Sequence, residues 1–220
     1  MIEIESWDQD GGHIAIGYDE DAKHTNPRQD SNIGTMICSH PRYNLGDEQG
    51  ADREYVTPCA VCGGGQEIAG IECASCLGQG ELAATPEEYF RHHRGARVVL
   101  PLWLYDHSGI SISCGERRGQ FADRWDSGLV GFVFDTPDGV KECIGDDATS
   151  EQIEAALRAE VAYYDTYLRG EVYGYVVTAP DGTEDSCWGF VGDLDDVKQT
   201  AREALAALTP KPQIEKSRSL

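Results

Sequence analysis

Apolar stretches and alternating apolar and polar residues predict the strands of this chain. A period of two is typical of β-strands with one buried face, and it occurs over residues 13–18 and 110–114. Strands are also expected at the apolar stretches 33–38, 96–105, 128–134, 171–179 and 184–191. The turn sequences at 106–109 and 180–183 each join two of these segments, so we expect two β-hairpins. A further turn at 136–139 is expected to lead into a short strand over 140–144.

Three segments have helical spacing instead. A capping box at 149–152 opens a helix that we expect to run to about residue 168, with apolar residues on one face. Asp193 is expected to cap a second long helix, whose apolar stripe comprises Leu194, Val197, Ala201, Leu205 and Leu208. A short helix is expected after Thr85, because this residue can cap it and Pro86 suits its first turn.

The order of these elements favours an α+β fold. Two hairpins, at least six strands and two long helices are predicted, with few strand–helix–strand units. We expect a mostly antiparallel twisted sheet, packed by the two long helices on one face. The α+β body would comprise residues 1–56 and 83–210, interrupted by an insertion at 57–82 and followed by a mobile tail at 211–220.

Four of the eight cysteines form two pairs with identical spacing. Two residues separate Cys59 from Cys62, two separate Cys73 from Cys76, and ten lie between the pairs. Two residues between ligands let one tight turn direct both sulfurs at a single ion, and two such turns complete a tetrahedral site. Because zinc is the usual occupant of a closed four-thiolate site, we predict one structural zinc ion.

Glycines follow both pairs, at 63–65 and at 78 and 80, and they permit the positive φ angles that such turns require. The pattern CxxCGGG…CxxCxGxG resembles the zinc-binding cysteine-rich module of DnaJ-type chaperones over about residues 57–82. The resemblance implies a zinc knuckle. It does not imply co-chaperone activity, because the His-Pro-Asp signature is missing and only two of that module's four repeats are present.

The net charge of the chain limits the classes of molecule that it is expected to bind. The chain has 39 acidic and 18 basic residues, a net charge of −21, and no basic stripe that could follow a phosphate backbone. Direct nucleic-acid binding is therefore not favoured. The acidity indicates either a soluble, self-repelling surface or one that imitates nucleic acid and competes for a basic partner. No apolar run approaches the roughly 18 residues of a membrane span, and the N-terminus is polar, so we expect no membrane association and a cytoplasmic protein.

Three polar segments could carry chemistry. If the protein is an enzyme, we expect His107 to act as the base, assisted by Asp106, Asp126 and His40. Adjacent side chains point apart, so Asp106 and His107 are not expected to pair with each other. The same sequences also suit ordinary turns, in which Asp and Ser bond their own backbone.

The remaining cysteines are isolated. Cys114 and Cys143 are expected to be small core residues within strands. Cys38 and Cys187 are also expected to be buried, although either could be a nucleophile if a histidine lies near it.

Several segments resemble a family of small proteins of bacteriophages and mobile elements. They are 32–47, 100–109 (LPLWLYDHSG), 125–132 (WDSGLVGF), 164–175 and 185–190 (DSCWGF). The resemblance implies a phage accessory protein that acts by binding, in host takeover or counter-defence, within the host cytoplasm. We expect a zinc-containing, non-enzymatic protein whose partner is a basic host or phage protein. The alternative is a small hydrolase or nucleic-acid-processing enzyme.

Overall fold

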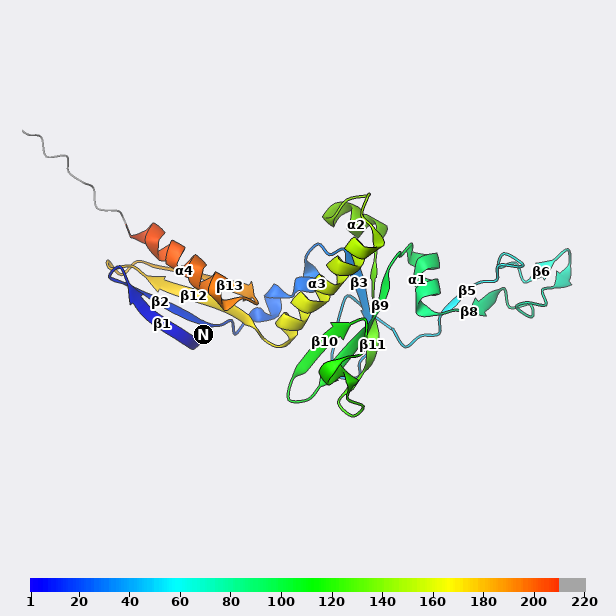
Figure 1. Ribbon diagram of the computed structural model, residues 1–220, viewed down its shortest axis with the longest axis horizontal. Coiled ribbons are helices and arrows are strands. Elements are labelled where there is room, and N and C mark those ends of the chain that lie inside the picture. Colours follow the sequence, from blue (N-terminus) through cyan, green and yellow to red (C-terminus); the bar gives the residue numbers. More distant parts are fainter. Residues whose placement is uncertain (210–220) are drawn as a thin grey trace, which may run out of the picture. The chain divides into compact units, whose positions relative to one another are not determined.

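The computed structural model describes residues 1–209 and divides them into two units, each with its own sheet and core (Figure 1). The first unit comprises Met1–Asn26 and the described residues from Arg169 onward, and the second is Pro27–Leu168. The class is α+β, as predicted. The sequence predicted a single sheet, whereas each long helix packs on a sheet of its own. The tail predicted at 211–220 lies outside the described residues.

An antiparallel four-stranded sheet forms the first unit. Its order is β1-β2-β12-β13, and the strands are β1 (Ile2–Gln9), β2 (Gly12–Tyr18), β12 (Val172–Thr178) and β13 (Glu184–Val191). Helix α4 (Leu194–Leu208) covers one face, and a short 3-10 helix, η1 (Ala22–Thr25), follows β2. Asp193 caps α4 by accepting a hydrogen bond from the Asp195 N–H at 2.8 Å. The predicted stripe of α4 packs on this sheet.

Strand β1 was missed by the sequence analysis. Asp10 and Gly11, at φ of 51° and 79°, form the two-residue turn that joins β1 to β2. Asp-Gly between two strands is a strong hairpin signal, because both positions need positive φ. Most side chains of β1 are exposed, so its sequence lacks the buried apolar face that predicts a strand.

The second unit has a five-stranded sheet in the order β10-β9-β11-β3-β4. Its strands are β3 (Gly34–Cys38), β4 (Glu48–Gln49), β9 (Val99–Asp106), β10 (Ile110–Cys114) and β11 (Ser127–Asp135). All neighbours are antiparallel except β3 and β4. Helix α3 (Ser150–Leu168) packs on β10 and β11 and buries Ile153, Leu157, Val161 and Tyr164 in the core. Short 3-10 helices lie at η2 (Pro27–Gln29) and η3 (Gly119–Ala122).

Two predicted helix starts are confirmed. The Thr149 N–H donates to the Gln152 side chain at 2.8 Å, and the Gln152 N–H donates back to Thr149 Oγ1 at 3.3 Å. Thr85 and Glu88 form the same reciprocal capping box at the start of α1 (Pro86–Arg94). Each box satisfies backbone N–H groups that the first helical turn would otherwise leave without a partner.

The prediction of a strand over 140–144 is wrong, because α2 (Pro137–Cys143) covers most of this stretch. Thr136 accepts a hydrogen bond from the Gly139 N–H at 3.1 Å, and Pro137 occupies the first turn, so the sequence taken for a turn is a helix start. Cys143 is therefore exposed, and Cys114 is only half-buried, so neither is a fully buried core residue. Cys38 is buried as expected, but Cys187 is exposed.

A buried arginine holds the loops around β3. The Arg28 guanidinium donates to both carboxylate oxygens of Asp47, at 3.0 and 2.6 Å, and also to Glu160, Asn32 and the Gly34 carbonyl. Its side chain is only 3% exposed. Burial raises the pKa of Glu160, and the Ile33 N–H and Arg28 oppose this shift. A charge in this position is tolerated because each of its donors has an acceptor.

The segment predicted as an insertion, residues 57–82, contains only short strand pairs. We call it the insert. Strands β5 (Val56–Pro58) and β8 (Glu81–Ala83) pair at its base, and β6 (Glu67–Ile68) pairs with β7 (Ile71–Glu72) within it. Among residues 1–209, no helix is long and apolar enough to cross a membrane.

Candidate metal centre

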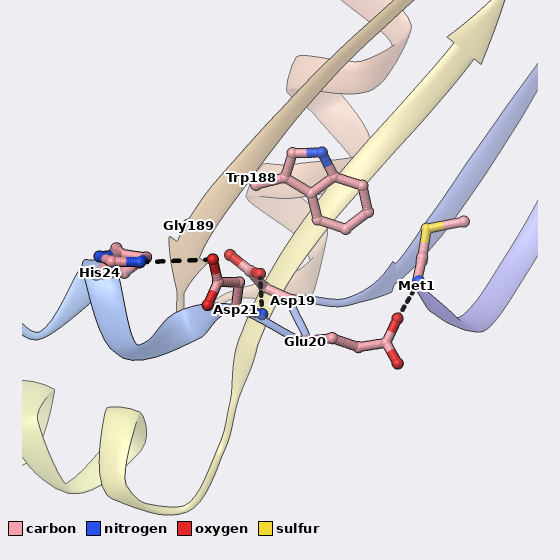
Figure 2. Close-up of a pocket in the computed structure, with 8 residues that line it drawn as sticks. Met1, Asp19, Glu20, Asp21, His24, Trp188 and Gly189 are labelled. Carbon is pink, nitrogen blue, oxygen red and sulfur yellow. Dashed lines mark hydrogen bonds and ion pairs between the residues drawn. The ribbon is translucent and has the colours of Figure 1, made fainter.

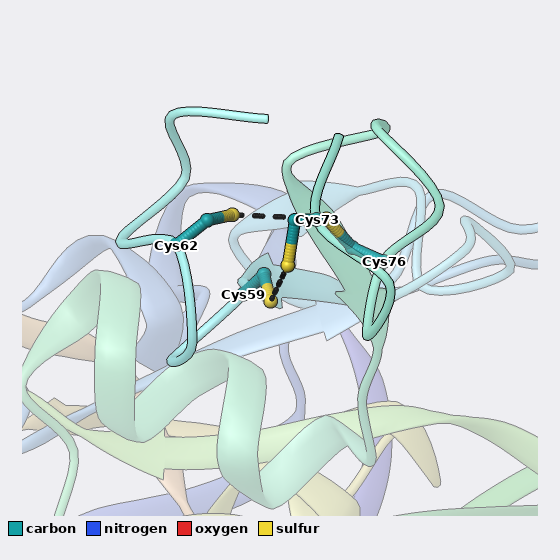
Figure 3. Close-up of side chains that lie close together, drawn as sticks. All are labelled: Cys59, Cys62, Cys73 and Cys76. Atoms are coloured by element: carbon teal, nitrogen blue, oxygen red, sulfur yellow. Dashed lines mark hydrogen bonds between the residues drawn. The ribbon is translucent and has the colours of Figure 1, made fainter. Parts of the chain in front are cut away.

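The two predicted cysteine pairs meet in the insert. One ligand atom from each of Cys59, Cys62, Cys73 and Cys76 lies within 4.8 Å of all the others, so these residues could hold a metal ion. Two loops supply them, one from each pair, and the side chains converge on a common centre (Figure 3). This is the only such group of histidine, cysteine and acidic side chains in the part of the chain that the structure describes.

The spacing of the sulfurs matches a tetrahedral site. The Sγ atoms of Cys59 and Cys73 are 3.9 Å apart, and those of Cys62 and Cys76 are 3.7 Å apart. Four sulfurs at about 2.3 Å from one ion form a tetrahedron with edges of about 3.8 Å. A disulfide would need sulfurs at about 2.05 Å, and all four thiols are free. The cluster therefore has the dimensions of an ion's coordination shell.

The two loops are near copies of each other, displaced by 14 residues. The Gly64 N–H donates to the Cys59 carbonyl at 3.3 Å, and the Gly78 N–H donates to the Cys73 carbonyl at the same distance. The loops are also joined reciprocally. The Cys59 N–H donates to the Gly80 carbonyl at 2.8 Å, and the Cys73 N–H donates to the Gln66 carbonyl at 2.9 Å.

Gln66, whose carbonyl closes one of the reciprocal bonds, was not predicted as part of the site, unlike the cysteines and glycines. The 14-residue displacement was visible in the printed sequence, as CAVCGGGQ over 59–66 and CASCLGQG over 73–80. Aligning these two stretches pairs Gln66 with Gly80. The repeat therefore marks Gln66 and Gly80 as equivalent positions of the two loops.

Positive φ angles follow each pair at equivalent positions. Gly63 and Gly64 have φ of 62° and 83° in the first loop, and Leu77 and Gly78 have φ of 49° and 72° in the second. Glycine adopts this region without strain, whereas a leucine does so at a cost of about 1–2 kcal/mol. Leu77 is nevertheless 72% exposed, so no burial of its side chain offsets that cost.

The insert has no apolar core apart from its cysteines. Its own buried cluster consists of Cys59, Cys73 and Cys76, with Cys62 packed against them. The only other buried residue between 57 and 82 is Gly80. A segment that buries so little apolar surface cannot offset the entropy of ordering its chain. Metal binding would supply this free energy, as in small metal-dependent modules.

The thiols have divergent acidities. The N–H groups of Cys76 and Ser75 lower the pKa of Cys73 to about 7, and burial raises the pKa of Cys76 to about 11. The Cys76 sulfur also accepts a hydrogen bond from the Gly80 N–H at 3.2 Å. Four thiolates this close would repel one another strongly unless a cation neutralised them. Four protein ligands would fill a tetrahedral ion's shell, so the site is suited to a structural ion.

Three of the four candidate catalytic residues lie in two ion pairs, whereas His40 Nδ1 accepts the N–H groups of Arg42 and Tyr43, both at 3.3 Å. His107 Nδ1 lies 3.0 Å from Asp126 Oδ2, whereas Asp106 pairs with Arg42 and accepts a hydrogen bond from the Tyr43 hydroxyl at 3.3 Å. As expected, Asp106 and His107 do not pair with each other. His40, Asp106 and Asp126 line a cavity of about 360 Å³ that His107 does not line. A catalytic role for these residues stays a prediction.

Comparisons with known proteins do not assign the chain to a family. No family model matches the chain, and neither a curated protein nor a solved structure matches it.

Proposed function

We propose that the chain is a zinc-containing, non-enzymatic binding protein that engages a basic host or phage protein. The observation that carries this proposal is the closed cluster of four cysteine sulfurs, with edges of 3.7 and 3.9 Å. Thiolate ligands select zinc among the common divalent ions, and a fully ligated ion stabilises structure instead of activating water. The ion would order the insert so that it presents a defined surface.

The insert's surface suits a partner that is both basic and apolar. Four of its apolar side chains are 46–73% exposed, namely Val61, Ile68, Ile71 and Leu77. Its charged residues are all acidic, at Glu67, Glu72 and Glu81. Glu67 and Glu72 lie directly opposite each other in the β6–β7 pair, where like charges destabilise the hairpin. A basic partner would relieve this repulsion.

The rest of the proposal draws on the sequence. A net charge of −21 supports a basic partner, including one that normally binds nucleic acid. The resemblance to phage and mobile-element proteins supports a role in host takeover or counter-defence, within the host cytoplasm. If this protein occupies the site at which its partner normally binds nucleic acid, it acts as a nucleic-acid mimic.

Affinity capture from host lysate tests the proposal. Tagged protein should retain one stoichiometric partner at low salt and lose it at moderate salt, because exposed charges are screened within about 8–10 Å under those conditions. Mass spectrometry would identify a partner whose own surface is basic. Capture of no stoichiometric protein, or of one whose affinity ignores salt, would contradict the proposal.

Matched variants test the contribution of the insert. Glu67→Gln with Glu72→Gln removes two charges from the insert, and Asp146→Asn with Asp147→Asn removes two exposed charges outside it. Both variants have the same net charge, so only a contact at the insert separates them. We expect the first to weaken the captured complex more than the second. Equal weakening would exclude the insert as the contact surface.

The alternative is a small hydrolase or nucleic-acid-processing enzyme. The observation that favours it is the pairing of His107 with Asp126 at 3.0 Å, since a carboxylate can orient an imidazole base. His107→Ala and Asp126→Ala would then fold normally and abolish an activity that the unaltered protein shows. Retained activity in both, or loss of folding, would remove this alternative.

A further inference from the structure

A second feature of the chain, a cavity in the first unit, combines acidic groups with an aromatic wall. Its volume is about 450 Å³, and Figure 2 shows it with the Trp188 indole beside the carboxylates of the loop that follows β2. Its principal lining residues are Met1, Asp19, Glu20, Asp21, His24 and Trp188. Every one of them belongs to the first unit.

Glycines on neighbouring strands position the Trp188 indole, which forms one side of the cavity. Trp188 of β13 lies opposite Gly174 of β12, and a Cβ atom at Gly174 would come within 2.2 Å of the indole Cε3. Gly174 in turn lies opposite Gly17 of β2, where a Cβ atom would come within 2.2 Å of Met1 Cγ. The indole and the Met1 side chain therefore lie directly on bare backbone. Trp188 is still 39% exposed, so its ring is positioned but not covered.

The charge at this cavity is negative. Three consecutive carboxylates follow β2, at Asp19, Glu20 and Asp21. Lys23 pairs with Asp21 at 3.0 Å, and the amino group of Met1 pairs with Glu20. Asp19 accepts the Asp21 N–H at 2.9 Å but pairs with no cation among residues 1–209, so one carboxylate charge is left without a counterion.

This combination selects an organic cation over the other ligands that a cavity could take. An anion would be repelled by the carboxylates. A metal ion is disfavoured because these oxygens do not converge, and the cysteine cluster is the only metal-competent group in the described chain. A guanidinium group suits both features, since its plane stacks on an indole and its edge donates to carboxylate oxygens.

We propose that this cavity receives an arginine side chain of the basic partner, stacked on Trp188 and hydrogen-bonded to Asp19. The inference rests on the proposed function, because it supplies the residue type by which the partner is recognised. It also places a contact in the first unit, separate from the insert. Tryptophan and arginine are among the residue types that are enriched at energetically dominant interface positions.

A small probe tests the cavity without the partner. N-acetyl-arginine amide is titrated into 15N-labelled protein while the indole N–H resonance of Trp188 is followed, and N-acetyl-citrulline amide serves as the neutral probe of nearly equal shape. We expect the arginine probe to shift this resonance at concentrations roughly ten-fold below those at which the citrulline probe does. Equal effects of the two probes would overturn the proposal.

Variants locate the binding. Trp188→Ala and Asp19→Asn should each weaken binding of the arginine probe, and Asp19→Asn keeps the size of the side chain if the tryptophan variant fails to fold. Trp125→Ala is the matched control, because Trp125 is 94% exposed and lies in the second unit. Unchanged binding in Asp19→Asn, or an equal loss in Trp125→Ala, would overturn the assignment.

The outcome is separable from that of the proposed function. If lysate capture yields a salt-sensitive partner that Trp188→Ala and Asp19→Asn retain fully, the proposed function stands and the cavity is not the contact. If the arginine probe binds as expected but capture yields no partner, the cavity binds guanidinium groups and the proposed function fails.

Discussion

Raising the free zinc concentration should stabilise the insert while leaving the sheets of both units unchanged. The insert buries only three cysteines and Gly80, so its opening exposes the ligands and releases the ion. A ligand that binds only the ordered form stabilises it by about 2.7 kcal/mol at 100 times its Kd and by about 4.1 kcal/mol at 1,000 times. Each ten-fold rise in free zinc should therefore increase the protection of insert amides about ten-fold.

Hydrogen exchange at buffered zinc concentrations measures this slope. The N–H groups of Cys59 and Cys73 are suitable reporters, because they join the two loops at 2.8 and 2.9 Å. Amides of β9 and β11, which pair in the core of the second unit, serve as internal controls. Protection of the insert that does not depend on zinc would contradict the coupling of zinc binding to order in the insert. A zinc-dependent change of equal size in β9 would contradict the prediction as well, since the insert would then not open independently.

Three further predictions concern single side chains. Arg28→Met should lower the free energy of unfolding of the second unit by about 3–5 kcal/mol in urea titrations, because Asp47 and Glu160 lose their buried cation. Arg118→Met removes an exposed ion pair and should cost less than about 1 kcal/mol, so similar losses in the two variants would contradict this prediction. Burial raises the pKa of Cys38 to about 12, so alkylation at pH 8 should modify the exposed Cys187 and spare Cys38, and comparable rates would show that Cys38 is accessible. Leu77→Gly should tighten zinc binding a few-fold in competition titrations by relieving the positive φ of 49°, and weaker binding would count against that strain.

Local chemistry made the helix starts and the metal centre predictable. Thr85, Thr149 and Asp193 cap helices through bonds that reach only two or three residues along the chain. The four cysteines are brought together by two tight turns, each encoded by its own CxxC spacing and glycines. Features of this kind can be read from sequence because the interacting groups are close neighbours in it.

Features that depend on distant partners were not predictable in this way. The division into two units arises because β2 pairs with β12, more than 150 residues later, while α3 packs on a different sheet. The bare backbone beneath Trp188 depends on Gly17 of β2 and Gly174 of β12 lying opposite each other. Similarly, the His107–Asp126 contact joins the turn after β9 to the residue just before β11. Periodicity indicates which face of a strand is buried, but not which strand lies beside it.

Metal analysis shows directly whether the four cysteines of the insert hold zinc. The unaltered protein, purified without chelator, should contain one zinc ion per chain, and the matched variant Cys187→Ser should retain it because that cysteine lies outside the cluster. Cys73→Ser should lose the ion and, with it, the protection of the insert's amides. Unaltered protein that contains no zinc, or a Cys73→Ser variant that keeps a full equivalent, would show that this cluster is not a structural zinc site.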